Sequence, residues 1–279
     1  MEIKDFSGKV EFTNDGRLSL FFVGTGSAFS KEFFQNNLII VKGNDHILID
    51  CGTLLPFILE VAYHTKISKI ENIILTHPHA DHIGGVEELI LNGRYVKKSK
   101  INIIINDEFK ELLWNQSLRG GCQYSEDGEM TFDDYFNQIK PSEIPGTPWP
   151  MWEANLGSIN VKLFRSFHVT TLPNSFEKSQ FSVGMIIDNR VLFTGDTQFK
   201  PEQLDWILKN YNIECIFHDC DISGYGVGVH TSYEQLKTLP ADVKRKMYLC
   251  HYNKNACKVN SKADGFAGFA RKGKYYIFD

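Results

Sequence analysis

Short runs of hydrophobic residues, separated by turn-forming residues, predict strands along most of the chain. Residues 18–23, 38–41 and 46–49 have the length and the β-branched content of buried strands. The Gly-Asn-Asp sequence at residues 43–45 predicts a tight turn between the last two. Further strands are predicted at residues 71–76, 101–105, 159–164, 181–187, 190–194, 214–217 and 247–249.

Helices are predicted between these strands. Residues 53–64 form one candidate, and Asn106 or Asp107 can cap a helix that runs to about residue 118. Pro201 fits the first turn of a helix over residues 201–208. Two more are predicted from about residue 84 and over residues 232–238. This alternation of strands and helices indicates the α/β class.

Residues 115–157 interrupt the pattern and predict an irregular insertion. A connection of this length in a compact domain is usually functional or disordered, and its many aromatic residues argue against disorder. We expect a lid or a dimer-contact element that could stack on a base, with packing on the domain's own surface as the alternative. The candidate aromatic residues are Tyr124, Tyr135, Trp149 and Trp152.

Composition limits the possible classes of protein. The 279 residues, 42% of them hydrophobic, are enough for a single domain over residues 1–279. The sequence has no apolar stretch long enough to cross a membrane and begins without the features of a signal peptide, so we expect a cytoplasmic protein with reduced cysteines. The net charge of −4 argues against a large nucleic acid as the partner.

A dense group of metal-binding residue types follows the strand predicted at residues 71–76. His77 and His79 are two positions apart in an extended segment, so their side chains can point to the same side. Asp81 and His82 follow where a helix begins and can face a neighbouring point. Imidazole and carboxylate ligands suit zinc, with manganese or iron as alternatives. Two pairs that face two points indicate two metal ions, which can hold both the attacking and the leaving oxygen in phosphoester hydrolysis.

The spacing His77-x-His79-x-Asp81-His82 resembles the signature of the metallo-β-lactamase fold. The resemblance extends from about residue 18 to about residue 255 and implies an αββα sandwich of two mixed sheets, with helices on the outer faces and metals at one edge. The other elements that carry it are the segments 24–28 and 48–52, His168 after a strand, the turn at residues 195–197, and His251 after the last predicted strand.

The resemblance implies seven ligands for two divalent metal ions, with zinc expected and manganese as the alternative. Asp196 would bridge the two ions. The first ion would be bound by His77, His79 and His168. The second ion would be bound by Asp81, His82 and His251.

Two further histidines resemble elements of the ribonuclease Z branch, the tRNA 3′-processing endonucleases. His230, within Gly-Val-His-Thr-Ser, is expected to act as the general acid or as a donor to the scissile phosphate, with a capping role as the alternative. His218 is expected to orient Asp196 or His251 from outside the ligand set, or simply to pack in the core. β-Lactamases have a cysteine where this chain has Asp196, so the resemblance points to phosphodiesters.

Ribonuclease Z enzymes carry a tRNA-gripping arm between the third-motif histidine and the bridging aspartate. Only the 27 residues 169–195 separate His168 from Asp196 here, and predicted strands fill 12 of them. The missing arm, the earlier insertion and the stretch at residues 228–236 resemble the anti-Pycsar proteins. These are metallo-β-lactamase-fold phosphodiesterases that degrade cyclic nucleotide immune signals.

This resemblance implies a homodimeric enzyme that converts 3′,5′-cyclic mononucleotides (cCMP, cUMP, cAMP and cGMP) to linear monophosphates, in the host cytoplasm if it is phage-encoded. Asp81 would orient the attacking water, and His230 would protonate the leaving alkoxide. A small phosphodiester needs no basic groove, which agrees with the net charge. The alternatives are a tRNA 3′ endonuclease, another small phosphoester hydrolase, and a protein that binds nucleotides without turnover.

Overall fold

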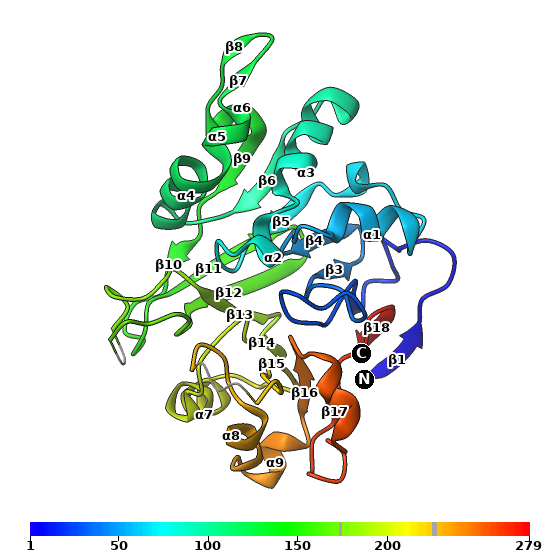
Figure 1. The fold of residues 1–279 in the computed structure, drawn as a ribbon, viewed down its shortest axis with the longest axis vertical. Helices are drawn as coiled ribbons and strands as arrows, with labels where there is room; N and C mark the ends of the chain where they lie inside the picture. Colours follow the sequence, from blue (N-terminus) through cyan, green and yellow to red (C-terminus); the bar gives the residue numbers. More distant parts are fainter. Residues whose placement is uncertain (173–174, 225–227) are drawn as a thin grey trace.

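The computed structural model describes residues 1–172, 175–224 and 228–279, and these residues form two eight-stranded sheets that pack face to face (Figure 1). In the first sheet, neighbouring strands pair in antiparallel fashion from β1 through β18, β2 and β3 to β4. They pair in parallel from β4 through β5 and β6 to β9. The spatial order is β1 (Glu2–Asp5), β18 (Lys274–Phe278), β2 (Leu18–Phe22), β3 (Leu38–Lys42), β4 (Asp45–Ile49), β5 (Asn72–Ile74), β6 (Ile101–Ile104) and β9 (Phe136–Ile139).

The second sheet repeats this division, with antiparallel pairs up to β14 and parallel pairs from β14 to β17. Its order is β10 (Ser142–Glu143), β11 (Met151–Leu156), β12 (Ile159–Arg165), β13 (Val183–Ile187), β14 (Val191–Phe193), β15 (Cys215–Asp219), β16 (Met247–Cys250) and β17 (Gly268–Phe269). A separate small hairpin consists of β7 (Tyr124–Ser125) and β8 (Gly128–Glu129).

Short helices connect the strands. The α-helices are α1 (Leu55–Val61), α2 (Ala80–Ile83), α3 (Val86–Asn92), α4 (Asp107–Leu113), α5 (Arg119–Cys122), α6 (Phe132–Tyr135), α7 (Pro201–Asn210), α8 (Tyr233–Lys237) and α9 (Ala241–Lys244). The remaining turns are the 3-10 helices η1 (Ile67–Lys69) and η4 (Lys254–Lys258) and the π-helical turns η2 (Gly93–Lys97) and η3 (Trp114–Leu118). Within the described ranges, no helix is long and apolar enough to cross a membrane.

Side-chain alternation along the strands divides the hydrophobic residues among three layers. In β3, Ile40 packs between the sheets, whereas Ile39 packs with the residues of α1, α3 and α4 on the outer face of the first sheet. In β15, Phe217 packs between the sheets, whereas Ile216 packs with α7 and α8 on the outer face of the second. Figure 1 shows α7 and α8 in the lower half of the view and α1 and α4 in the upper half, with strands of both sheets between them. These layers confirm the αββα sandwich.

The segment at residues 115–157 is more regular than the sequence indicated. Its strand β9 extends the parallel half of the first sheet, and β11 pairs along its whole length with β12 of the second. The prediction of an irregular insertion is therefore wrong for these strands. Their side chains are only partly buried, which weakens the hydrophobic pattern from which a strand is recognised.

Most of the aromatic residues of this segment pack against the rest of the domain. Tyr135 is buried and donates a hydrogen bond of 2.9 Å to a backbone carbonyl. Trp152 packs against the core, and the ring of Trp149 lies 5.9 Å from that of Trp206 on α7. Tyr124, on the β7–β8 hairpin, is 74% exposed. A lid or dimer-contact role for this segment stays a prediction.

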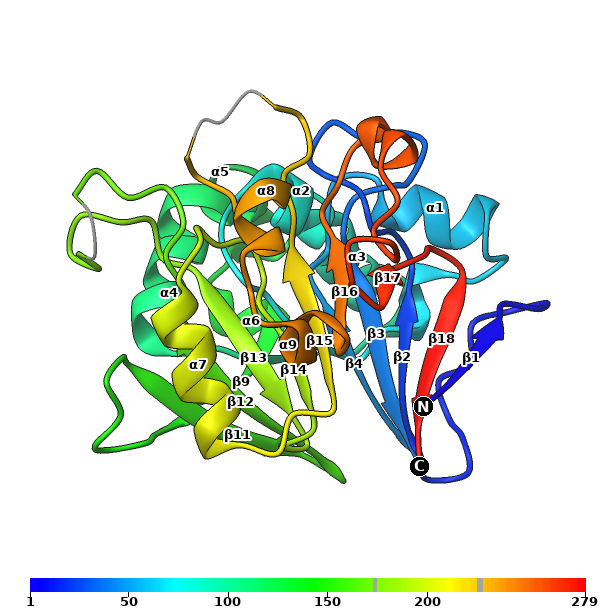
Figure 2. The same cartoon turned by 90° about the horizontal axis from the view of Figure 1, so that it is seen from below.

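The parallel strands of both sheets end at one edge of the sandwich. In Figure 2 the arrowheads of β15 and β16 point toward this edge, where several connecting loops gather. Polar residues follow these strands, as is common where parallel strands end in α/β folds. Asp50 follows β4, Asp196 follows β14, Asp219 ends β15, and His251 follows β16.

Candidate metal centre

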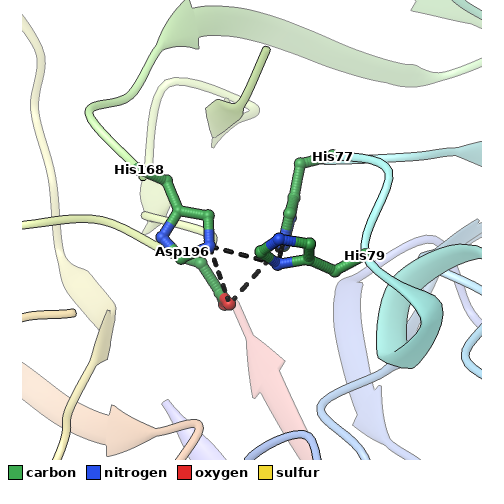
Figure 3. Close-up of side chains that lie close together, drawn as sticks. All are labelled: His77, His79, His168 and Asp196. Atoms are coloured by element: carbon green, nitrogen blue, oxygen red, sulfur yellow. Dashed lines mark hydrogen bonds and ion pairs between the residues drawn. The ribbon is translucent and has the colours of Figure 1, made fainter. Parts of the chain in front are cut away.

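Three histidines and one aspartate converge at this edge (Figure 3). His77 follows β5, His79 is the N-cap of α2, and His168 follows β12. Nδ1 of His79 lies 2.9 Å from Nε2 of His77 and 3.2 Å from Nε2 of His168. The same two Nε2 atoms lie 3.7 and 3.9 Å from Oδ2 of Asp196. The structure thus brings together the residues predicted to bind the first ion.

A second group shares Asp196 with the first. Nε2 of His82 lies 3.2 Å from Oδ2 of Asp81 and 3.4 Å from Oδ2 of Asp196. Nε2 of His251 lies 3.3 and 3.4 Å from the same two oxygens. All four side chains are buried. The residues predicted to bind the second ion therefore also lie together, and Asp196 is placed where it could bridge.

The spacing of these atoms fits divalent metal ions. Ligand atoms about 2.0–2.1 Å from zinc at tetrahedral angles lie roughly 3.4 Å from one another, close to the separations in both groups. Among the described residues, the buried atoms Nε2 of His82 and Oδ1 of Asp196 have no hydrogen-bond partner. Buried polar atoms rarely stay unpaired in a native fold, and a cation would satisfy both.

The protonation states of the first group also suit a cation. Burial lowers the pKa of His168 to about 4 and that of His77 well below its usual range, so both rings are neutral at pH 7. Burial raises the pKa of Asp196, but the nearby imidazoles of His251 and His82 outweigh it and hold the net pKa well below the ordinary value. Neutral imidazoles and an ionised carboxylate are the forms that bind metal ions.

Asp50 supports one of these histidines, a role that its place in the sequence does not indicate. Its Oδ2 lies 2.7 Å from Nδ1 of His82, and its Oδ1 accepts a 2.7 Å hydrogen bond from the backbone N–H of Thr76. A carboxylate on Nδ1 fixes the tautomer and the orientation of a metal-binding histidine. His168 is held in a similar way, because its Nδ1 lies 2.8 Å from the carbonyl oxygen of Val229.

The carboxylate of Asp219 contacts the rings of His230 and His251. Its Oδ2 lies 2.9 Å from Nδ1 of His230, and its Oδ1 lies 3.5 Å from Nδ1 of His251. Burial raises the pKa of Asp219, but the contact with His230 outweighs it and the pKa falls to about 2. The backbone N–H of Thr197 donates to the same carboxylate at 2.9 Å. Asp219 is therefore an ionised, fixed support for the site.

His230 lies at the more open side of the two groups. Its ring stacks on that of His251 with centroids 4.8 Å apart, and its side chain is 21% exposed. Burial lowers its pKa, but the carboxylate of Asp219 outweighs this and the net pKa is raised. Because Asp219 occupies Nδ1, the ring presents Nε2 to a ligand. This arrangement is compatible with proton donation.

His218 lies on the opposite face of β15 from Asp219. Its ring borders a small cavity beside α7, together with Leu192 and Leu204, and its Nδ1 lies 2.8 Å from the carbonyl oxygen of Asp219. Within the described part of the chain, the structure does not bring His218 into contact with Asp196 or His251. The neighbouring Asp219 makes the contact with His251 instead.

Left-handed backbone conformations place several of these side chains. Asp50 and His251 have φ angles of +61° and +60°, which are uncommon for residues other than glycine and cluster at functional sites. Gly195, with φ +57°, precedes Asp196, and a Cβ at this position would lie 2.7 Å from the carbonyl oxygen of Val183. The Thr-Gly-Asp turn therefore needs glycine both for its conformation and for its close approach to β13.

Comparison with known proteins relates this site to a family. The family model described as "Anti-Pycsar protein Apyc1" matches residues 18–276. The anti-Pycsar protein Apyc1 of Bacillus phage vB_BsuM-Goe3 is 33% identical over 266 residues, which cover 91% of this chain and 96% of the relative. The protein of the same name from Paenibacillus xerothermodurans is 30% identical over 261 residues, which cover 94% of this chain and 98% of the relative.

Solved structures show the same fold at lower sequence identity. The metallo-β-lactamase fold protein YhfI from Bacillus subtilis matches with a TM-score of 0.68 at 15% identity, covering 94% of this chain and all of that one. Human tRNase Z, short form (ELAC1), matches with a TM-score of 0.58 at 16% identity, covering 92% and 98% of the two chains. The family match and the phage and bacterial relatives show that this chain belongs to the anti-Pycsar Apyc1 family, on a metallo-β-lactamase fold.

Proposed function

We propose that this chain is a dinuclear metal-dependent phosphodiesterase that hydrolyses 3′,5′-cyclic mononucleotides to linear nucleoside monophosphates. The observation that carries the proposal is the pair of buried His/Asp groups that share Asp196. Family membership supports a metal-dependent phosphodiesterase, and the name of the family supports cyclic nucleotide immune signals as substrates. The negative net charge favours a small phosphodiester over a polynucleotide.

The residues of the two groups would hold two divalent metal ions, with zinc favoured by the histidine-rich ligand set. Such ions activate a water molecule and neutralise charge on the phosphoryl oxygens. The role of the protein's own residues is to orient the reacting groups. Asp81 lies between His82 and His251, and these neighbours outweigh burial and hold its pKa well below the ordinary value. As a carboxylate, it can accept a hydrogen bond from the attacking water.

His230 is the residue best placed to protonate the leaving group. Asp219 fixes the ring through Nδ1 and raises its pKa, so that Nε2 can carry a proton near neutral pH. A general acid with a pKa near the working pH is the most effective. Breaking the bond from phosphorus to the 3′ oxygen leaves an alkoxide, which takes the proton from Nε2, and the product is the 5′-monophosphate.

We also propose that the chain forms a cytoplasmic homodimer, in which residues 115–157 act as a lid or a dimer contact. Tyr124 of this segment is 74% exposed and is available for a contact of this kind. Size-exclusion chromatography with light scattering measures the assembly directly. A monomer at micromolar concentration would contradict this part of the proposal without affecting the catalytic part.

The test of the catalytic proposal is a substrate panel. The purified chain, loaded with zinc or manganese, is incubated with cCMP, cUMP, cAMP and cGMP, a linear dinucleotide, and a precursor tRNA, and the products are separated by chromatography. We expect conversion of cyclic mononucleotides to 5′-monophosphates while the tRNA stays intact. Trimmed tRNA with intact cyclic nucleotides would overturn the proposal in favour of a processing nuclease.

A further inference from the structure

A second pocket lies between the open edges of the two sheets. Its volume is about 420 Å³, and it is bordered by β16 and β17 of the second sheet and by β18 and β1 of the first. None of the metal-ligand candidates borders it. Pockets that bind small molecules usually have volumes of roughly 300–1,000 Å³, so this pocket is large enough for a nucleotide-sized ligand.

The charge of this pocket is positive. Lys262, Arg271 and Lys274 border it, and no described residue that borders it is acidic. Lys274 forms an ion pair with Asp5 of β1. Across the described ranges, Lys262 and Arg271 form no ion pair, and both are exposed. An anionic group in the pocket would therefore meet two cations without competing carboxylates.

One wall of the pocket is aromatic and fixed in position. Tyr248 is half-buried, and its ring stacks on Phe217 with centroids 5.6 Å apart and meets the ring of Tyr276 edge-on at 5.2 Å. Phe269 extends this wall from β17. Because both rings are held by core contacts, a planar group could stack on the wall without first ordering it.

Gly268 brings the cationic and the aromatic parts of the pocket together. Its φ is +146°, and a Cβ there would lie 3.7 Å from Cε of Lys262 and 3.9 Å from Cε1 of Tyr248. The lysine stem and the tyrosine ring therefore lie side by side over the glycine. A ligand that stacks on the ring would have its charged group within reach of the lysine.

We infer that this pocket binds a phosphorylated nucleoside, with its phosphate between Lys262 and Arg271 and its base against Tyr248. Arginine and lysine are the usual side chains for phosphate, and bases stack on aromatic side chains with little regard to sequence. This binding site is separate from the metal groups and does not depend on hydrolysis. Its failure would therefore leave the proposed reaction standing.

Isothermal titration calorimetry of AMP into the metal-loaded full-length chain tests this inference. The test variant is Lys262→Glu/Arg271→Glu. The matched control is Lys66→Glu/Lys69→Glu, which makes the same charge change at exposed positions on and beside η1. Turnover of bis(p-nitrophenyl) phosphate, a generic phosphodiester, reports on the metal groups in each protein.

We expect the wild type and the control to show a binding event that the test variant weakens by about tenfold or more, the size expected for lost charged hydrogen bonds. Phosphodiester turnover should be equal in all three proteins. If the test variant binds AMP with the same stoichiometry and affinity as the wild type, the pocket is not a nucleotide site.

Further ligands identify the recognised group and its source. AMP should bind about tenfold more tightly than ribose 5-phosphate or inorganic phosphate, because these lack the base that stacks. Equal affinities would overturn the nucleotide assignment and leave a simple anion site. A hydrolysis-resistant cyclic phosphorothioate of adenosine, compared with AMP, distinguishes a cyclic from a linear ligand. Both are phosphorylated nucleosides, and a binding event of either that the test variant weakens supports the inference, whereas binding that the variant leaves unchanged belongs to the metal groups.

Discussion

Nδ1 of His230 lies 2.9 Å from Oδ2 of Asp219, and this contact both orients the ring and raises its pKa. We predict that Asp219→Asn lowers kcat by roughly 10–100-fold, the usual cost of removing such a supporting carboxylate. KM should change little, because the Asp219 side chain is fully buried and offers substrate no contact surface. Steady-state kinetics with a cyclic nucleotide provides the measurement.

The same contact predicts that the effects of His230→Ala and Asp219→Asn on kcat are not additive when the two substitutions are combined. His230→Ala should leave the metals bound and lower kcat by roughly 10²–10⁴, the contribution typical of a general acid. If Asp219 acts mainly through His230, adding Asp219→Asn to His230→Ala should cost little more. Metal content, measured by atomic emission, is the control for both variants. An unchanged rate for His230→Ala would show that this ring has a structural role.

Asp196 belongs to both His/Asp groups, so its removal should affect both metal sites. We predict that Asp196→Ala abolishes turnover and leaves less than one tightly bound metal per chain. Chelation should lower the Tm of the wild type but not that of the variant, because a bound ion stabilises only the folded state. Asp205→Ala, at an exposed position on α7, is the control. A variant that keeps two metals would exclude a bridging role.

Among the described residues, Asp50 makes its direct contact with the second group, through Nδ1 of His82, and reaches His77 of the first group only through the hydroxyl of Thr76. Asp50→Asn should therefore weaken binding of the second ion by roughly 10–100-fold and leave the first ion in place. Titration of zinc against a competing chelator separates the two binding constants. Asp15→Asn, at an exposed position, serves as the control. Equal weakening of both ions would mean that Asp50 acts on the fold and not on one histidine.

Strand alternation explains which parts of the site were predictable from the sequence. His77 and His79 stand out because both follow a hydrophobic run and share one side of an extended segment. On β15 the same rule predicts that Asp219, and not His218, faces the metal groups. Asp219 is two residues after Phe217, so both side chains point to the same face of the sheet, and Phe217 packs between the sheets. The metal-binding chemistry of histidine favours His218, but its position along the strand points its side chain away from the metal groups.

Other features of the fold leave little trace in the sequence. All four side chains of β1 are exposed, so this strand has no alternation, and its pairing with β18 joins the two ends of the chain. Strands β9 and β11 are only partly buried, so their sequences predict an irregular insertion instead of strands. The support of Asp50 for His82 depends on contact between residues 32 positions apart, which only the folded chain reveals.

A buried histidine remote from the metal groups predicts how stability depends on pH. Burial lowers the pKa of His46, against a smaller opposing effect of Glu71. Its Nε2 lies 3.2 Å from the backbone N–H of Glu71, from which it accepts a hydrogen bond, and its ring meets Phe12 edge-on at 4.9 Å. Protonation of Nε2 would remove this acceptor, so the folded state favours the neutral ring.

The sign of the effect follows from proton linkage. Above the unfolded pKa, about 6.5, the ring is neutral in both states and pH has no effect through this group. As the pH falls below that value, the unfolded chain takes up a proton that the folded chain resists, and stability is lost until the lowered folded pKa is reached. We predict that His46→Gln reduces the fall in the urea midpoint between pH 7 and pH 5. His64→Gln, at an exposed position, should keep the wild-type slope; the same slope in His46→Gln would show that His46 is not the titrating group.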